Sequence, residues 1–163
     1  MEILIDKREL LKKARERKLN LGIVEKDYVL GWLLFGFSES SLIFKGGTAL
    51  SKIFFPEVWR LSEDLDFSFS GKFETIDMEK ILKRANEESG IKFWIKNRHE
   101  NPEYLQIKIQ YQGLLGKNWA KIDINRERVF CQEKREVPRI YSDYPEFSVR
   151  VMGLEEMNAF SGH

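Results

Sequence analysis

Hydrophobic residues recur with the spacing of helices in the first part of the chain, and they mainly alternate with polar residues, as in strands, later. Asp6 and Glu9 form a capping-box pattern, so we expect a helix from there to about Lys18 with a narrow apolar stripe. A second helix is expected over residues 23–35, capped by Asn20. Its apolar residues fall on nearly all sides, which predicts that this helix is buried against the rest of the domain.

Strand patterns begin after these helices. Residues 42–45 are expected to form a short strand, followed by a helix from Thr48 to Phe54 that ends before a proline. Residues 64–70 alternate as a strand, and residues 76–89 form an amphipathic helix closed by a glycine. The remaining expected elements are strands over 91–98, 104–112, 119–125 and 147–151 and a terminal helix over 154–160. This order predicts an α+β (mixed α/β) fold with helices packed on one face of a sheet.

Length and composition limit the classes of protein that this chain can belong to. Its 163 residues are expected to form a single domain, with N-terminal helices over 1–37, a core over 38–151 and a short C-terminal helix over 152–163. A net charge of +1 argues against a general polyanion binder. We expect no secretory signal, because the first residues do not combine a basic segment with a long apolar one, and the apolar stretch over 29–37 is too short to cross a bilayer. We therefore expect a cytoplasmic protein that has no membrane partner.

Two adjacent glycines, Gly46 and Gly47, lie between the first expected strand and the helix that follows it. Because they lack side chains, a ligand can approach the backbone closely, and the amides at the start of the next helix would point at it. Thr48 could add a hydroxyl donor, and a triphosphate is the natural occupant of such a site. Glycine pairs also make ordinary turns, and the segment matches neither the dinucleotide fingerprint nor the P-loop.

Asp64 and Asp66 are separated by one residue in an expected strand, so their carboxylates lie on the same face, together with Ser68. Two carboxylates roughly 7 Å apart repel each other. A bound divalent cation would remove the repulsion, and hard oxygen ligands of this kind suit Mg²⁺. The alternative is an edge strand that exposes acidic side chains to solvent.

A later expected strand places Lys121, Asp123 and Asn125 on one face. If this strand is a neighbour of the first, Asp123 would add a third carboxylate and complete a two-metal site of the kind used in nucleotidyl transfer. Lys121 could then neutralise phosphate charge. The alternative is a surface ion pair between Lys121 and Asp123, which would contribute little to stability.

Four segments together carry a family resemblance. They are Glu25-Lys-Asp-Tyr28, Gly46-Gly-Thr-Ala-Leu50, Arg60-x-Ser62-x-Asp64-x-Asp66-Phe67 and Lys121-x-Asp123. In this order they resemble the motifs of the AbiEii/AbiGii toxin-type nucleotidyltransferases, which belong to the DNA polymerase β-like nucleotidyltransferase superfamily. The resemblance runs from residue 25 to residue 125, with a trace at Leu154-Glu-Glu-Met157.

The resemblance implies a polymerase β-like sheet and a role for each motif. The residues expected to coordinate Mg²⁺ are Asp64, Asp66 and Asp123. Those expected to hold the nucleoside triphosphate are Gly46, Gly47, Thr48, Arg60 and Ser62. Lys121 is expected to stabilise charge on the phosphates, and Asp123 to accept or orient the acceptor proton. The implied reaction transfers a nucleoside monophosphate to an acceptor hydroxyl and releases pyrophosphate.

The resemblance also implies a biological setting. Family members are toxins of toxin–antitoxin or phage-defence systems, and some modify the acceptor ends of tRNA. The implied partners are therefore a nucleoside triphosphate, a tRNA, another RNA or a protein as acceptor, and a cognate antitoxin. Family members continue to a lysine at a position where this chain has Ser161, so we expect a short member, a fragment or a member with altered activity.

Two other readings of the sequence stay open. The first is a non-catalytic nucleotide-binding or RNA-binding module on the same fold, in which basic residues between Lys117 and Arg139 form a nucleic-acid face. A solvated surface explains the same basic residues. The second is a protein-binding component, such as the partner of an antitoxin.

Overall fold

A single seven-stranded sheet organises the chain. The structure, a computed structural model, describes residues 3–57 and 63–161, and of residues 158–161 only the backbone. The strands are β1 (Ile43–Lys45), β2 (Asp64–Phe69), β3 (Lys92–Asn101), β4 (Tyr104–Gly113), β5 (Gly116–Arg126), β6 (Gln132–Glu136) and β7 (Ser148–Met152). Their order in the sheet is β3-β4-β5-β2-β1-β7-β6. The pairs β2–β5 and β1–β7 are parallel and the other pairs are antiparallel, so the sheet is mixed.

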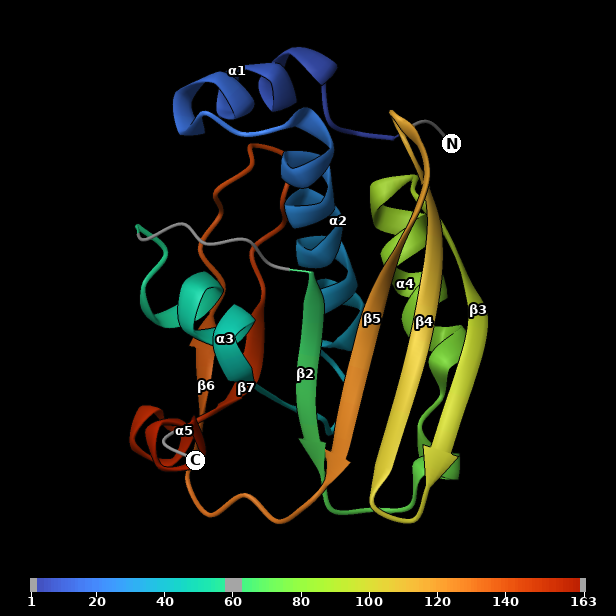
Figure 1. The fold of residues 1–163 in the computed structure, drawn as a ribbon, viewed down its shortest axis with the longest axis vertical. Helices are drawn as coiled ribbons and strands as arrows, with labels where there is room; N and C mark the ends of the chain where they lie inside the picture. The colour runs from blue at the N-terminus through green and yellow to red at the C-terminus, as the bar shows by residue number, and fades with distance from the viewer. Residues whose placement is uncertain (1–2, 58–62, 162–163) are drawn as a thin grey trace.

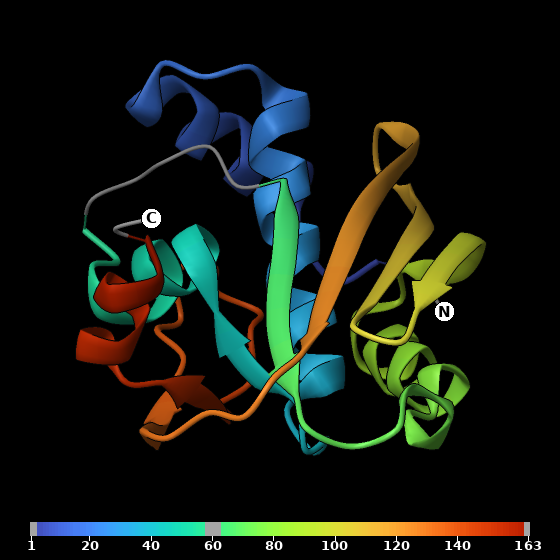
Figure 2. The same ribbon diagram turned by 60° about the horizontal axis from the view of Figure 1, so that its bottom comes forward.

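Helices surround this sheet unequally. They are α1 (Lys7–Arg17), α2 (Leu21–Phe37), α3 (Gly46–Ala49), α4 (Met78–Ser89) and α5 (Leu154–Ser161), with a π-helical turn at Leu50–Phe54 and a 3₁₀ turn at Phe73–Thr75. The long helices α2 and α4 pack against each other and lie behind the sheet in Figure 1. No helix lies in front of β3, β4 and β5 in the same view, and Figure 2 shows the same arrangement from below. Within the described ranges, no helix is both long and apolar enough to cross a membrane.

The core lies between the sheet and these two helices. On β4 the odd-numbered residues are buried beneath the helices, whereas the even-numbered ones face the uncovered side. Helix α2 is buried on nearly all sides, as its sequence predicts, and its fully buried residues include Tyr28 and Trp32. The predicted mixed α/β fold, with its long helices on one face, is confirmed.

Several local predictions are confirmed and others are wrong. Asp6 and Asn20 cap α1 and α2 through bonds to the amides of Arg8 and Gly22. Glu9 does not complete a capping box, since its carboxylate accepts hydrogen bonds from Ser142 in a distant loop. Helix α3 begins at the glycine pair instead of after it. Strand β6 was not expected, because its five exposed, mostly charged residues show no hydrophobic alternation.

Candidate active site

The strand register brings together side chains from distant parts of the sequence. Asp66 on β2 lies opposite Asp123 on β5 on one side and opposite Lys45 on β1 on the other. Asp64 lies opposite Lys121 in the same β2–β5 pair. The three aspartates and Lys121 therefore share one face of the sheet, the face that α2 and α4 leave uncovered.

Mutual repulsion and burial shift the titration of the two β2 carboxylates. Burial, together with the nearby negative charges of Asp123 and Asp64, raises the pKa of Asp66 to about 6. Burial also raises the pKa of Asp64, and the neighbouring Lys121 partly opposes that shift. A cation beside these carboxylates would oppose both shifts, because it favours the charged form.

Lys121 stands between two of these carboxylates. Its Nζ lies 3.6 Å from Asp64 Oδ2 and 3.8 Å from Asp123 Oδ2. Across residues 3–57 and 63–157, no three His, Cys, Asp or Glu side chains converge closely enough to hold a metal ion in this conformation. The ammonium therefore compensates part of the negative charge, and the oxygen donors are of the type that Mg²⁺ prefers.

Two residues on β4 hold Asp123 in place. Tyr104 Oη donates to Asp123 Oδ1 at 2.6 Å, and Gln106 Nε2 donates to the same oxygen at 3.0 Å. Burial and the hydrogen bond to Asp123 raise the pKa of Tyr104 to about 12, so the phenol keeps the proton that it donates. With Oδ1 occupied in this way, Oδ2 is the oxygen that Asp123 presents toward Lys121.

Lys45 forms a second polar group beside Asp66. Its Nζ donates to Asn125 Oδ1 at 3.0 Å and forms an ion pair with Glu127. The hydroxyl of Ser68, which is fully buried, donates to the same Glu127 carboxylate. This group places a cation on the opposite side of Asp66 from Asp123.

The glycine segment lies directly against Asp66. Gly46 has φ +83°, and a Cβ there would stand 2.8 Å from Asp66 Oδ2. Both the backbone conformation and the lack of space therefore favour glycine at this position. Thr48 is buried, and its Oγ1 donates to the carbonyl of Asp64 at 2.7 Å. Thr48 thus ties α3 to the start of β2, and its hydroxyl proton is already committed to the protein.

Of the remaining residues predicted for the site, Gly47 lies in α3 next to Gly46. Arg60 and Ser62 lie outside the described residues. The basic residues of the 117–139 segment do not form one patch, because Lys134 and Arg135 lie on β6 while Lys117 and Lys121 lie on β5. Three strands separate β5 from β6 in the sheet.

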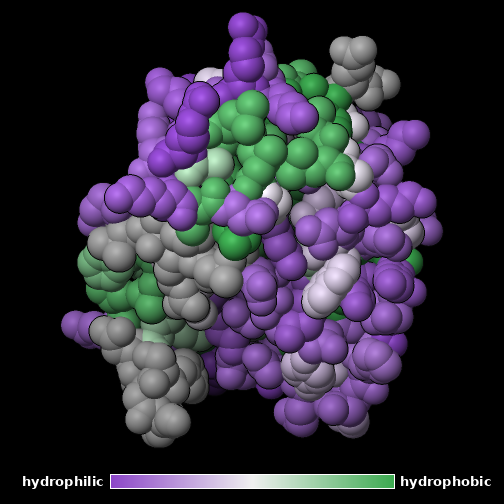
Figure 3. All heavy atoms as spheres, turned by 45° about the horizontal axis from the view of Figure 1, so that its top comes forward, coloured by the Kyte–Doolittle hydropathy of each residue, from purple (hydrophilic) through white to green (hydrophobic). Residues whose placement is uncertain are grey.

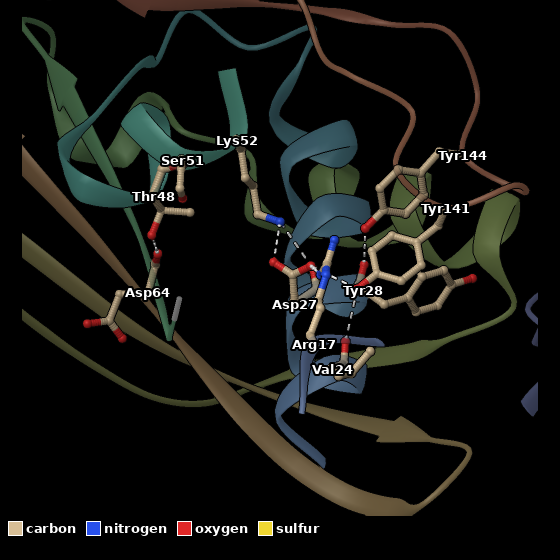
Figure 4. A network of polar contacts seen from close by, with 10 residues as sticks. All are labelled: Arg17, Val24, Asp27, Tyr28, Thr48, Ser51, Lys52, Asp64, Tyr141 and Tyr144. Carbon is tan, nitrogen blue, oxygen red and sulfur yellow. Dashed lines mark hydrogen bonds and ion pairs between the residues drawn. The ribbon is translucent and has the colours of Figure 1, made fainter. Parts of the chain in front are cut away.

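A buried ion pair anchors the segment that carries the glycines. Lys52, on the π-helical turn, donates from Nζ to Asp27 Oδ1 on α2 at 2.8 Å, and both side chains are 5% exposed (Figure 4). Tyr141 Oη donates to Asp27 Oδ2 at 2.8 Å, and Arg17 Nη1 lies 3.9 Å from the same oxygen. Burial alone would raise the pKa of Asp27, but the charge of Lys52 and these contacts hold it below its ordinary value.

Sequence reasoning missed most of these supporting residues. Lys45 precedes the glycine pair, and Tyr104 and Gln106 alternate on a strand, so their position next to the aspartates depends on strand order. Asp27 belongs to the Glu25–Tyr28 motif and Lys52 to the helix expected over 48–54, but neither pattern indicates that the two side chains pair. The signal that could have identified Asp27 is the run of charged residues Glu25-Lys26-Asp27 on a helix expected to be buried on nearly all sides, since a buried charge requires a partner.

A mixed sheet with carboxylates on two adjacent strands and a glycine segment against them defines a nucleotidyltransferase-type fold. The model of the family described as "Nucleotidyl transferase AbiEii toxin, Type IV TA system" matches residues 31–159. The chain belongs to this family. No curated protein matches the sequence.

Solved structures share the fold at low sequence identity. MenT4, a nucleotidyltransferase toxin from Mycobacterium tuberculosis, superposes with a TM-score of 0.68 at 20% identity, over 96% of this chain and 57% of that one. JHP933 from Helicobacter pylori gives a TM-score of 0.59 at 16% identity, over 87% of this chain and 56% of that one. The chain thus spans less than two thirds of the length of either protein.

Proposed function

We propose that this chain is an Mg²⁺-dependent nucleotidyltransferase of toxin–antitoxin or phage-defence type. It transfers a nucleoside monophosphate from a nucleoside triphosphate to an acceptor hydroxyl on tRNA, another RNA or a protein. The observation that carries the proposal is the register that sets Asp66 opposite Asp123, with Gly46 against Asp66. Family membership and the likeness to MenT4 support the same reaction class.

Three carboxylates on two adjacent strands fit magnesium by the chemistry of their donor atoms. Asp64, Asp66 and Asp123 would hold the ion, and their hard oxygens match its preference. Burial, together with the negative charges of neighbouring carboxylates, raises the pKa values of Asp64 and Asp66, and a bound cation would lower both because it favours the charged form. When bound, the metal supplies Lewis-acid stabilisation of the phosphates.

The protein's own side chains supply the remaining functions. The backbone at Gly46 and Gly47 allows the triphosphate to approach β2 closely. Lys121 stabilises negative charge that develops on the phosphates, since its ammonium already lies beside two carboxylates. Asp123, held by Tyr104 and Gln106, accepts the proton of the acceptor hydroxyl through Oδ2.

In the reaction, the acceptor oxygen forms a bond to the α-phosphorus. The bond between that phosphorus and the oxygen bridging to the β-phosphate breaks, and pyrophosphate leaves with the electron pair. A cognate antitoxin would be the partner that restrains this activity, in keeping with the toxin–antitoxin family.

The test is transfer of label from α-labelled nucleoside triphosphates, each of the four in turn, to a broad RNA pool or to protein in the presence of Mg²⁺. Asp66→Asn should abolish incorporation while the variant stays folded by circular dichroism. Glu136→Gln, an exposed carboxylate on the edge strand β6, is the matched control and should retain full activity.

Two results would overturn the proposal. One is full incorporation of label by Asp66→Asn, which would mean that the reaction does not need the Asp66 carboxylate. The other is absence of incorporation by the folded wild-type protein with any of the four nucleotides. If that protein still binds nucleotide in a Mg²⁺-dependent way, it is a non-catalytic nucleotide-binding module.

A further inference from the structure

The uncovered face of β3, β4 and β5 is rich in basic, amide and aromatic side chains and poor in acidic ones. Strand β4 has no acidic residue, and β5 has only Asp123. The basic residues that these two strands place on the uncovered face are Lys108, Lys117 and Lys121. The lower right part of the molecule in Figure 3, on the side where these strands lie in Figure 1, is mainly hydrophilic.

Two tryptophans lie in one row across this face. Trp94 on β3 is opposite Gln110 on β4, and Gln110 is opposite Trp119 on β5. Two strand spacings separate the tryptophans, which puts them roughly 10 Å apart. Trp119 is 39% exposed, so an aromatic surface is available beside a polar amide.

Lysine ammonium groups lie near both tryptophan rings. Lys108 Nζ lies 3.9 Å from the centre of the Trp119 ring, and Lys26 Nζ, from α2, lies 4.7 Å from it. Lys117 Nζ lies 6.0 Å from the centre of the Trp94 ring. These ammonium groups lie over the Trp119 ring, so a base that stacks on the ring takes the place of one of them. The displaced lysine side chain is long and flexible enough to contact a phosphate beside that base.

This face is continuous with the candidate active site. Trp119, Lys121 and Asp123 alternate along β5 and therefore point to the same side. Asp123 lies four positions after Trp119, which corresponds to roughly 13 Å along the strand. A strand of nucleic acid lying along β5 could thus contact Trp119 and still reach the aspartates.

We propose that this face, defined by Trp94, Lys108, Lys117 and Trp119, binds the acceptor as a single-stranded polynucleotide whose 3′ hydroxyl reaches Asp123. The inference rests on the proposed transfer reaction and assigns its acceptor surface. Trp119 stacks on an unpaired base, and Lys108 and Lys26 contact the flanking phosphates. Stacking on exposed aromatics beside basic side chains is how proteins hold single strands, whereas a duplex keeps its bases stacked internally.

The test measures binding of a fluorescent single-stranded RNA by anisotropy, with no nucleoside triphosphate present. Trp119→Ala should weaken binding roughly tenfold or more, because one stacked base is lost, and Trp119→Phe should retain most of the affinity. Lys108→Gln should weaken binding and reduce the slope of log K against log salt concentration by about 0.7. Lys134→Gln, an exposed lysine on β6, is the matched control and should bind like the wild type.

A DNA strand and a duplex of the same sequence complete the comparison. Equal binding of single-stranded RNA and DNA supports the surface and locates the choice of sugar elsewhere, and preference for RNA supports it directly. Preference for the duplex overturns the proposal, as does binding that Lys134→Gln weakens and Trp119→Ala does not. No binding of any oligonucleotide also overturns it, and a protein acceptor then becomes the alternative.

The surface and the reaction can fail separately. If Trp119-dependent binding is observed but no label is incorporated, the reaction is wrong and the surface stands. If label is incorporated equally well by Trp119→Ala and wild type, the surface is wrong and the reaction stands.

Discussion

The buried pair of Lys52 and Asp27 gives a strong test of how this fold supports its site. Replacing Lys52 with Met removes the ammonium and keeps a side chain of similar shape. The Asp27 carboxylate, 5% exposed, then loses its partner at 2.8 Å and retains Tyr141 Oη at 2.8 Å and Arg17 Nη1 at 3.9 Å. We expect the free energy of unfolding to fall by about 3–5 kcal/mol, the usual effect of removing one partner of a buried ion pair and leaving the other charge buried.

The distance explains why the effect should be large for one substitution and small for two. At 2.8 Å and an effective dielectric constant of about 20, the attraction between the charges is roughly 6 kcal/mol. Most of it offsets the cost of removing two charges from water. The double variant Lys52→Met/Asp27→Leu loses both terms, so its stability should lie within about 2 kcal/mol of the wild type.

Urea unfolding, followed by tryptophan fluorescence and circular dichroism, measures all four proteins of this cycle. Lys83→Met is the matched control, because Lys83 forms an exposed pair with Glu87 at 3.8 Å and should change stability by no more than about 0.5 kcal/mol. The reasoning is refuted if Lys52→Met is no more destabilising than Lys83→Met. It is also refuted if the double variant loses the sum of the two single losses.

Four further predictions follow from the site and from α2. Because the folded-state pKa of Asp66 is raised from 3.8 to about 6, the native protein binds more protons than the unfolded chain between these values, and its stability should fall as pH rises from 4 to 6. Asp66→Asn should weaken this dependence and be more stable by about 1–2 kcal/mol above pH 6, and an unchanged profile in urea unfolding would contradict the assignment. Millimolar Mg²⁺ should raise the melting temperature of the wild type more at pH 8 than at pH 5 and should not raise that of Asp66→Asn, as a thermal shift assay can check. Gly46→Ala should lose about 1–2 kcal/mol in urea unfolding because its φ is +83°, and equal stability would mean that the turn relaxes. Gly31→Ala would put a Cβ 2.0 Å from Tyr144 Oη and should cost about 1–3 kcal/mol by the same assay, unless the tyrosine can move.

Local pattern was sufficient to predict much of the fold. The caps at Asp6 and Asn20, the all-round apolar character of α2 and the closing Gly90 of α4 depend on neighbours within a few residues. The alternation of Asp64 and Asp66 is local in the same sense, so their common face could be read from the sequence. Strand β6 could not be read in this way, because its side chains are exposed on an edge and carry no apolar alternation.

The sequence by itself therefore determined which residues share a face within each strand or helix. The tertiary structure decided which faces meet: Asp66 beside Asp123 and Lys45, Tyr104 against Asp123, and Lys52 buried on Asp27. The physical reason is that side-chain direction follows from the backbone period of one segment. Strand order and the pairing of buried charges instead depend on the packing of segments far apart in the chain, which no local pattern records.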